Sequence, residues 1–236
     1  MPPAVLGDII SWIESHDIGK IWLCGSSRLN WSLSEGGAVQ KLDCELPNCQ
    51  RLGWPSLAAS LPRLQTFALV FLQENQALKL TPDHLLSLPR SLTSLQLGLA
   101  DDILLLEQTL ARDPAHFRGL TDLFISGYES KPGSVADARL GANLPRNLQT
   151  LVIGSREMVL RVEPFIVWDQ LPPGLTLLKT LNFLFCKPHC DFKFPSTLTR
   201  LQITTTELKI LDMLPTGLED LTLSAESTGD NWPPHL

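Results

Sequence analysis

Apolar residues recur along this chain at regular spacing instead of in long runs. With L standing for any apolar residue, the pattern is L-P-x-x-L-x-x-L-x-L. It occurs in full four times, starting at Leu88, Leu144, Phe194 and Leu214. In an extended chain, the closing L-x-L places its two apolar side chains on one side and the residue between them on the other. Each copy therefore predicts one short strand with a buried side and an exposed side.

Looser copies of the pattern fill the gaps between the full ones. The copy that begins at Leu61-Pro62 has lost one residue, and the copy that contains Leu120 lacks the proline. The copy that begins at Leu171-Pro172 is interpreted with three residues inserted. Two weaker copies open the chain. In chain order the looser copies end in Ile18-x-x-Ile21-x-Leu23, Val39-x-x-Leu42-x-Cys44, Leu64-x-x-Phe67-x-Leu69, Leu120-x-x-Leu123-x-Ile125 and Leu178-x-x-Leu181-x-Phe183.

The copies form an ordered series over most of the chain. The first residue of each L-x-L falls at 21, 42, 67, 95, 123, 151, 181, 201 and 221, so the steps are 20 to 30 residues. A unit of this length cannot bury its own apolar side, and stability must come from stacking on its neighbours. We therefore expect nine parallel strands in one sheet.

This series resembles the leucine-rich-repeat family over roughly residues 15–225, and is most similar to the family's proline-marked variants. The resemblance implies an α/β solenoid, with a curved parallel sheet on the concave face and short helices and turns on the convex face. One feature departs from the family. Many members carry Asn or Cys five residues after the first L of L-x-L, whereas this chain has Ala100, Tyr128, Arg156, Cys186, Thr206 and Glu226. The turns must therefore find other backbone partners.

The longer units leave room for helices on the convex face. Thr81-Pro82-Asp83 is typical of a helix start, with an N-cap followed by proline at the first helical position. The run from Asp101 to Leu110 predicts the clearest helix, because two aspartates suit the positive end of its dipole. A single helical turn is expected around Glu207–Met213.

Three segments follow from the pattern: a cap helix over 1–17, an array of nine units over 18–225, and a tail over 226–236. The segment Asp8–Ile13 resembles the end of an F-box, but too few residues precede the first strand to predict an intact one. In the tail, Trp232-Pro233-x-x-Leu236 matches the opening of a tenth repeat. Either the tail lies over the last strand, or the chain is a fragment or a truncated product, or a partner covers this open end, which otherwise invites self-association.

Composition excludes several classes of protein. The chain is 44% hydrophobic and 19% charged, which favours a globular fold over disorder. Its net charge of −6 disfavours nucleic-acid binding, which depends on a basic surface. We predict no membrane span and no secretory signal. Five cysteines without paired spacing favour a reduced, cytoplasmic setting.

Candidate chemistry is sparse. Cys186-Lys187-Pro188-His189-Cys190 is the one metal-like cluster, but zinc sites usually need four ligands in separated pairs. We interpret it as a turn and predict no metal, no cofactor and no catalytic residue, since no hydrolase, zinc-protease, phosphate-binding or dinucleotide motif is present. An enzyme that uses this cluster remains the least favoured alternative.

The residues between the two apolar positions of each L-x-L define the expected binding face. Aromatic residues there, Trp22 and Phe124, are typical recognition anchors. The competing interpretation is that these residues merely suit exposed strand positions. The predicted partner-binding residues are Trp22, Asp43, Gln96, Phe124, Val152, Asn182, Gln202 and Thr222, with Ala68 in the same column.

These observations favour a non-catalytic module, or scaffold, that recognises a protein partner of unknown identity through the concave face. The alternative is the substrate-recognition part of a ubiquitin-ligase adaptor or effector whose other domain is absent from this chain.

Overall fold

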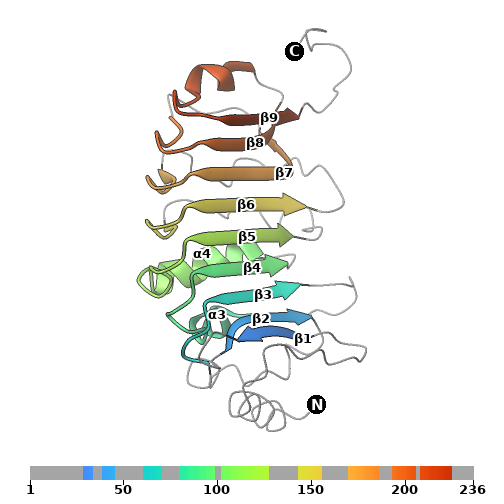
Figure 1. The fold of residues 1–236 in the computed structure, drawn as a ribbon, viewed down its shortest axis with the longest axis vertical. Helices are drawn as coiled ribbons and strands as arrows, with labels where there is room; N and C mark the ends of the chain where they lie inside the picture. Colours follow the sequence, from blue (N-terminus) through green and yellow to red (C-terminus); the bar gives the residue numbers. More distant parts are fainter. Residues whose placement is uncertain are drawn as a thin grey trace.

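The computed structural model describes residues 29–33, 39–45, 61–70, 80–98, 102–127, 143–155, 170–185, 193–205 and 208–224. Within them, nine strands form a single sheet, and the strands follow one another in the sheet in chain order (Figure 1). The strands are β1 Leu29–Leu33, β2 Val39–Glu45, β3 Thr66–Val70, β4 Ser94–Gly98, β5 Asp122–Gly127, β6 Thr150–Ser155, β7 Leu177–Phe185, β8 Arg200–Thr205 and β9 Asp220–Ser224.

The sheet is parallel from β2 to β9, as expected, but the expectation of a wholly parallel sheet is wrong at its first strand. β1 runs antiparallel to β2. Only residues 34–38 connect the two strands, whereas a parallel connection needs a crossover of about a dozen residues or more. The apolar pattern did not identify β1. The strand predicted over 18–23 lies outside the described residues.

The apolar positions of L-x-L align from strand to strand and face the core. Leu95 pairs in register with Leu123, and Leu97 with Ile125. From β3 to β8, the side chains at these two positions are at most 4% exposed. Full burial of such a side chain contributes roughly 1.5–3 kcal/mol, so the two columns are the main source of stability.

In β7 the predicted register is wrong by three residues. Leu178, not Leu181, pairs with Leu151 on one side and with Leu201 on the other. The copy therefore starts at Leu171-Pro172 and needs no insertion. The steps around it are 27 and 23 residues instead of 30 and 20. The prediction failed because it required an apolar residue at the second inward position, where Thr180 lies, 4% exposed.

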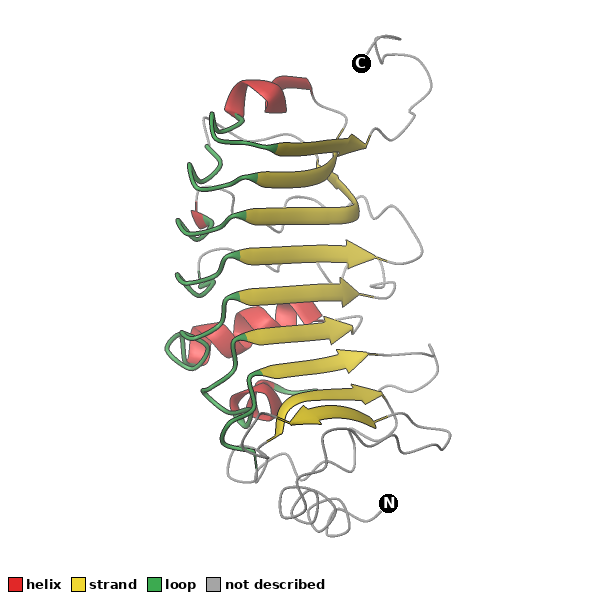
Figure 2. Cartoon of the chain, in the orientation of Figure 1, coloured by secondary structure: helices red, strands yellow, loops and turns green. Residues whose placement is uncertain are grey.

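Beyond Lys179, β7 separates from β8, although its pairing with β6 continues to Leu181. After Lys179 pairs with Gln202, pairing to β8 resumes only at Leu184, which pairs with Thr204. The longer β7 therefore carries a bulge, and Figure 2 shows the strand bending toward β8 at its carboxyl end. Bulged strands bend because unpaired residues interrupt the ladder. The extra length is the reason that two apolar registers competed in the sequence.

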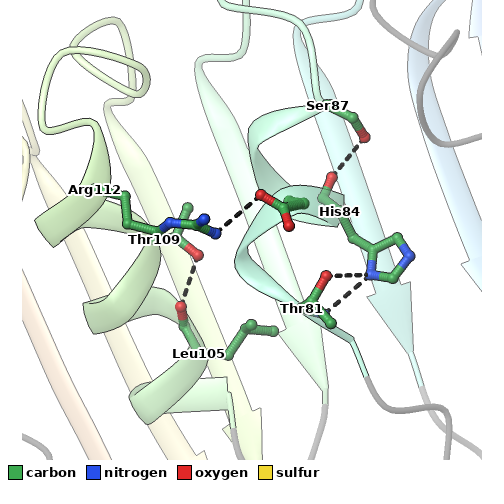
Figure 3. Close-up of polar contacts among 7 residues, drawn as sticks. Thr81, His84, Ser87, Leu105, Thr109 and Arg112 are labelled. Atoms are coloured by element: carbon green, nitrogen blue, oxygen red, sulfur yellow. Dashed lines mark hydrogen bonds and ion pairs between the residues drawn. The ribbon is translucent and has the colours of Figure 1, made fainter.

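Two helices cover one face of the sheet, and α4 packs against β5 (Figures 1 and 2). They are α3 Pro82–Leu86 and α4 Asp102–Arg112, and a 3-10 helix, η3 Leu208–Met213, precedes β9. All three were predicted within a few residues. Figure 3 shows α3 beside α4, joined by an ion pair of 2.9 Å between Arg112 and Asp83. The backbone N–H of Thr81 donates to Nδ1 of His84 at 3.0 Å, which satisfies one group at the start of α3.

A tight turn of four residues precedes each strand from β3 to β9, and in five of these seven units the turn is the P-x-x-L segment. In seven successive units the backbone N–H of the final L donates to the carbonyl oxygen three residues earlier, at 2.9–3.2 Å. These turns stack along one edge of the sheet, which we name the turn edge (Figure 2). The first and last residues of the turns are Leu61–Leu64, Pro89–Leu92, Phe117–Leu120, Pro145–Leu148, Pro172–Leu175, Pro195–Leu198 and Pro215–Leu218.

Side chains tie each turn to the preceding one. The hydroxyl of Ser91 donates to the carbonyl oxygens of Pro62 and Leu64 at 2.9 and 2.7 Å. Thr197 repeats this arrangement with Pro173 and Leu175 at 2.7 and 2.8 Å. The third residue of the turn is the donor in both cases, and in Asn147, whose Nδ2 donates to the carbonyl of Arg118 at 2.9 Å. We name these contacts the turn ladder.

A second set of contacts joins the residues that follow the turns. From Gln65 to Thr199, the carbonyl of the residue directly after each turn accepts two backbone N–H groups from the next unit at 2.8–3.0 Å. Four threonine hydroxyls add a bond of 3.1–3.2 Å to the same carbonyls: Thr93, Thr121, Thr176 and Thr199. The positions expected to hold an asparagine ladder lie outside the described residues. The turn ladder and the threonine hydrogen bonds lie instead at the amino ends of the strands.

Candidate binding face

The face of the sheet opposite α3 and α4, which we name the open face, carries the middle residues of L-x-L. Gln96, Phe124 and Val152 stand in one register column, followed by Lys179, Gln202 and Thr222. The inward neighbours of Phe124 are 0% and 2% exposed, whereas Phe124 itself is half-buried. The alternation of the strand therefore presents this column away from the core, with Thr222 the most exposed member.

Four residues expected on this face are not shown there as exposed side chains. Asn182 does not stand in the column, because the corrected register of β7 places Lys179 there. Asp43 pairs in register with Ala68 through its backbone, while its side chain lies outside the described residues. Trp22 also lies outside them. Ala68, the smallest residue of the column, is 5% exposed.

An apolar patch lies at the centre of the open face. Phe124 pairs with Val152 across β5 and β6, and Leu177 stands in the preceding column of the neighbouring β7, beside Thr150. All three apolar side chains are half-buried. Since adjacent strands are about 4.7–4.9 Å apart, these side chains can contact one flat ligand surface together. We name Phe124, Val152 and Leu177 the apolar patch.

Two cations border the apolar patch toward the C-terminal strands. Lys179 lies beside Val152 in register, and Arg200 lies beside Leu177. Lys179 is half-buried and Arg200 is exposed. On the other side of the patch Asp122 accepts a hydrogen bond of 2.8 Å from the Thr121 hydroxyl. Lys179 and Arg200 therefore place positive charge between the apolar patch and β9, where Asp220 stands beside Arg200 in register.

The sequence interpretation missed Leu177 and Lys179. Both were hidden by the shift of three residues in β7. The signal that would have found them is the intact Leu171-Pro172-x-x-Leu175 spacing, which fits the full pattern if a small polar residue is allowed at the second inward position.

His116 is a buried polar residue in an apolar column. It occupies the position that Leu88 and Leu144 fill in other units, and it is 5% exposed. Its Nε2 lies 2.9 Å from the carbonyl oxygen of Leu88. Its ring packs edge-on against the ring of Phe117, with the two ring centroids 4.7 Å apart. Burial lowers the pKa of His116, opposed by the hydrogen bond to Leu88. This histidine has the environment of a core residue.

The described ranges contain neither a metal-binding cluster nor a membrane-spanning helix. No group of three His, Cys, Asp or Glu side chains there is arranged to hold a metal ion. The Cys186–Cys190 segment lies outside these ranges. None of the helices that the structure describes has the length and apolar character needed to cross a membrane.

The last described strand presents a different kind of surface. Leu221 of β9 and Leu211 of η3 are each 39% exposed. Leu221 belongs to the same inward column as Leu201, which is 2% exposed. Trp232, which we expected as a candidate cover for this end, lies outside the described residues.

Comparison of the chain with protein-family models, curated proteins and solved structures finds no match.

Proposed function

We propose that the chain is a leucine-rich-repeat solenoid that recognises a protein partner through its open face and catalyses no reaction. The repeated turn, strand and inward leucine columns support the repeat assignment, because each unit is stabilised mainly by its neighbours. The main support for recognition is the apolar patch beside Lys179 and Arg200, on a sheet face that no described helix covers.

The chemistry of this face favours a particular kind of partner segment. Half-buried Phe124, Val152 and Leu177 would lose their remaining water contact on binding an apolar side chain, which contributes about 25 cal/mol per Å² of apolar surface removed from water. A carboxylate next to that side chain would meet Lys179 and Arg200. The expected motif is therefore an apolar residue, preferably aromatic, followed or preceded by Asp or Glu.

Selection from a random peptide library on the immobilised full chain tests this proposal. We expect enrichment of peptides with the apolar-acidic motif. Phe124→Ala should weaken their binding by about 1–3 kcal/mol, as at a typical hot spot, and Lys179→Gln should weaken it less. Both variants should keep the thermal unfolding midpoint, because neither side chain belongs to the inward columns.

Matched controls separate the open face from the rest of the surface. Gln202→Ala changes a neutral residue in the same column, and Arg112→Gln removes an exposed arginine from the helix-covered face. Gln202→Ala should weaken peptide binding less than Phe124→Ala does, and Arg112→Gln should leave the affinity unchanged. The proposal is wrong if no peptide is enriched, or if the enriched peptides bind Phe124→Ala as well as the original chain. A loss of stability in Phe124→Ala would assign that residue to the core instead.

A further inference from the structure

Arginines recur at one position of the turn edge. The second residue of the turn is Arg90, Arg118 and Arg146 in three successive units, and Arg63 stands one position later in the turn before them. All four residues are exposed. The other turns have Pro62, Pro173, Ser196 and Thr216 at the second position. We name Arg63, Arg90, Arg118 and Arg146 the arginine ridge.

The fold does not require arginine at this position. Proline, serine and threonine occupy it in turns that form the same backbone hydrogen bond. Stacked turns repeat at the strand spacing of about 4.7–4.9 Å, so consecutive arginines of the ridge repel one another. Neutral residues fill this position in the other turns. The repeated arginines are therefore better explained by binding of a ligand than by a contribution to stability.

Carboxylates of the described residues neutralise little of the ridge. Arg90 pairs with Asp113 at 3.0 Å, with side chains 65% and 32% exposed. Asp122, which follows the same turn as Arg118, is hydrogen-bonded to Thr121 on the open face. No ion pair joins Arg63, Arg118 or Arg146 to another residue in the described part of the chain. Three guanidinium groups are therefore available to a ligand, and guanidinium binds carboxylates in a two-pronged geometry.

The spacing of the ridge selects the shape of the ligand. Residues i, i+3, i+7 and i+10 of a helix share one face and lie at about 0, 4.5, 10.5 and 15 Å along its axis. Four stacked turns span about 14–15 Å in steps of about 4.8 Å. An extended strand repeats its side chains on one face only every 6.6–6.8 Å or so, which falls out of step with the turns.

From this juxtaposition we infer that the arginine ridge is a second docking surface, and that it binds the acidic face of a helix of a partner protein. Nucleic acid is the weaker candidate because the chain carries a net charge of −6 and offers no surplus of cations to a polyanion that extends past the ridge. The inference depends on the stacked turns alone. It stands whether or not the open face binds a peptide.

Fluorescence anisotropy with a labelled helical peptide tests the ridge on the full chain. The peptide carries Glu at i, i+3, i+7 and i+10 in an alanine-rich sequence, and its matched control has Gln at those positions. We expect the Glu peptide to bind at low salt and the Gln peptide not to bind. Arg118→Gln and Arg146→Gln should each weaken binding about two- to fivefold, since exposed charge pairs contribute modestly, and raising salt should weaken it further.

The controls locate the site and identify the ligand class. Arg112→Gln removes an exposed arginine that lies outside both the ridge and the open face, and should leave the affinity for the Glu peptide unchanged. The inference is overturned if the Glu peptide does not bind, or if Arg118→Gln and Arg146→Gln leave its affinity unchanged. Ridge-dependent binding of single-stranded oligothymidylate that is tighter than that of the Glu peptide overturns the assignment to a protein helix.

Discussion

The interior strands and the last described strand carry the same sequence pattern in the same register, yet they bury it differently. Leu123 in β5 is 0% exposed, and Leu201 in β8 is 2% exposed. Leu221, at the same position of β9, is 39% exposed. Between β5 and β9 neither the residue type nor the hydrogen-bond register changes. What changes is that β5 has a described strand on each side, whereas β9 has one only on the side of β8.

This contrast shows that burial in such a stack is a property of neighbours. A leucine contributes its full hydrophobic stabilisation only when the next unit covers it. The turn edge behaves differently, because each turn is bonded to the one before it. Leu218 closes its turn at 3.2 Å, and Asp220 donates to the carbonyl of Thr199 at 3.0 Å, as in the interior units. The hydrogen-bonded edge is therefore complete in β9, while the apolar column is not.

The largest expected effect tests the apolar column directly. Leu123→Ala should lower the free energy of unfolding by roughly 2–5 kcal/mol, because it leaves a cavity in a packed interior. Leu221→Ala removes the same atoms from a partly exposed position and should cost about 1 kcal/mol or less. Urea denaturation measures both. Equal losses would mean that β9 is as well covered as β5 and would remove the contrast.

The turn ladder should give a smaller effect. Thr197→Val keeps the shape of the side chain but removes its two hydrogen bonds to Pro173 and Leu175, and should cost about 1–2 kcal/mol. Ser196→Ala, in the same turn, changes a hydroxyl with no hydrogen bond to the residues that the structure describes, and should cost less than about 0.5 kcal/mol. If both variants unfold at the same urea concentration, the turn ladder does not stabilise the stack.

His116 should make one interior unit sensitive to acid. Its pKa is lowered, chiefly by burial, so the folded chain holds it neutral while the unfolded chain protonates it near the ordinary value of about 6.5. The associated stability is complete above that pH and is lost as the pH falls below it, because the unfolded state then binds more protons. Arg90 and Asp113 face this histidine and act in opposite directions.

His116→Leu restores the residue type that other units carry at this position. We expect the variant to lose less stability than the original chain between pH 7 and pH 5, as measured by thermal unfolding at each pH. Parallel decreases in the two proteins would assign the acid sensitivity to other groups.

The smallest expected effect is a gain. Gly174 and Gly217 occupy the turn position where Ser91 bonds to the preceding turn, and a Cβ there would lie 3.8 Å from carbonyl oxygens of that turn. Neither glycine adopts a left-handed backbone. Serine should therefore reproduce the Ser91 contacts and restrict the unfolded chain, which stabilises by about 0.5–1 kcal/mol.

A comparison of the two glycine variants returns to the contrast between interior and end. Gly174→Ser lies in the turn before β7 and Gly217→Ser in the turn before β9, and both bond backward to a described turn. The gains measured by urea denaturation should be equal if the turn edge is complete in β9. A gain at Gly174 alone would show that the end of the stack is loosened at its turn edge as well.

Local sequence patterns predicted β2 to β6, β8 and β9, together with α3, α4 and η3, because each depends on residues close together in the chain. Period-two alternation identified the inward leucines, and Thr81-Pro82 marked the start of α3. Wherever the register was correct, the sequence also predicted which residues share one outward column of the sheet: Gln96, Phe124, Val152, Gln202 and Thr222. Their role in partner binding stays a prediction.

The sequence by itself determined which residues alternate between the core and the open face, since this follows from local backbone geometry. Only the tertiary structure decided the register of β7, because Leu178 fits the spacing from the proline whereas Leu181 fits the closing L-x-L, and pairing with β6 and β8 selects between them. It also decided the direction of β1, the stacking of the arginines along the turn edge and the exposure of Leu221. Each of these depends on contacts between units that are distant in the chain, and local periodicity carries no information about such contacts.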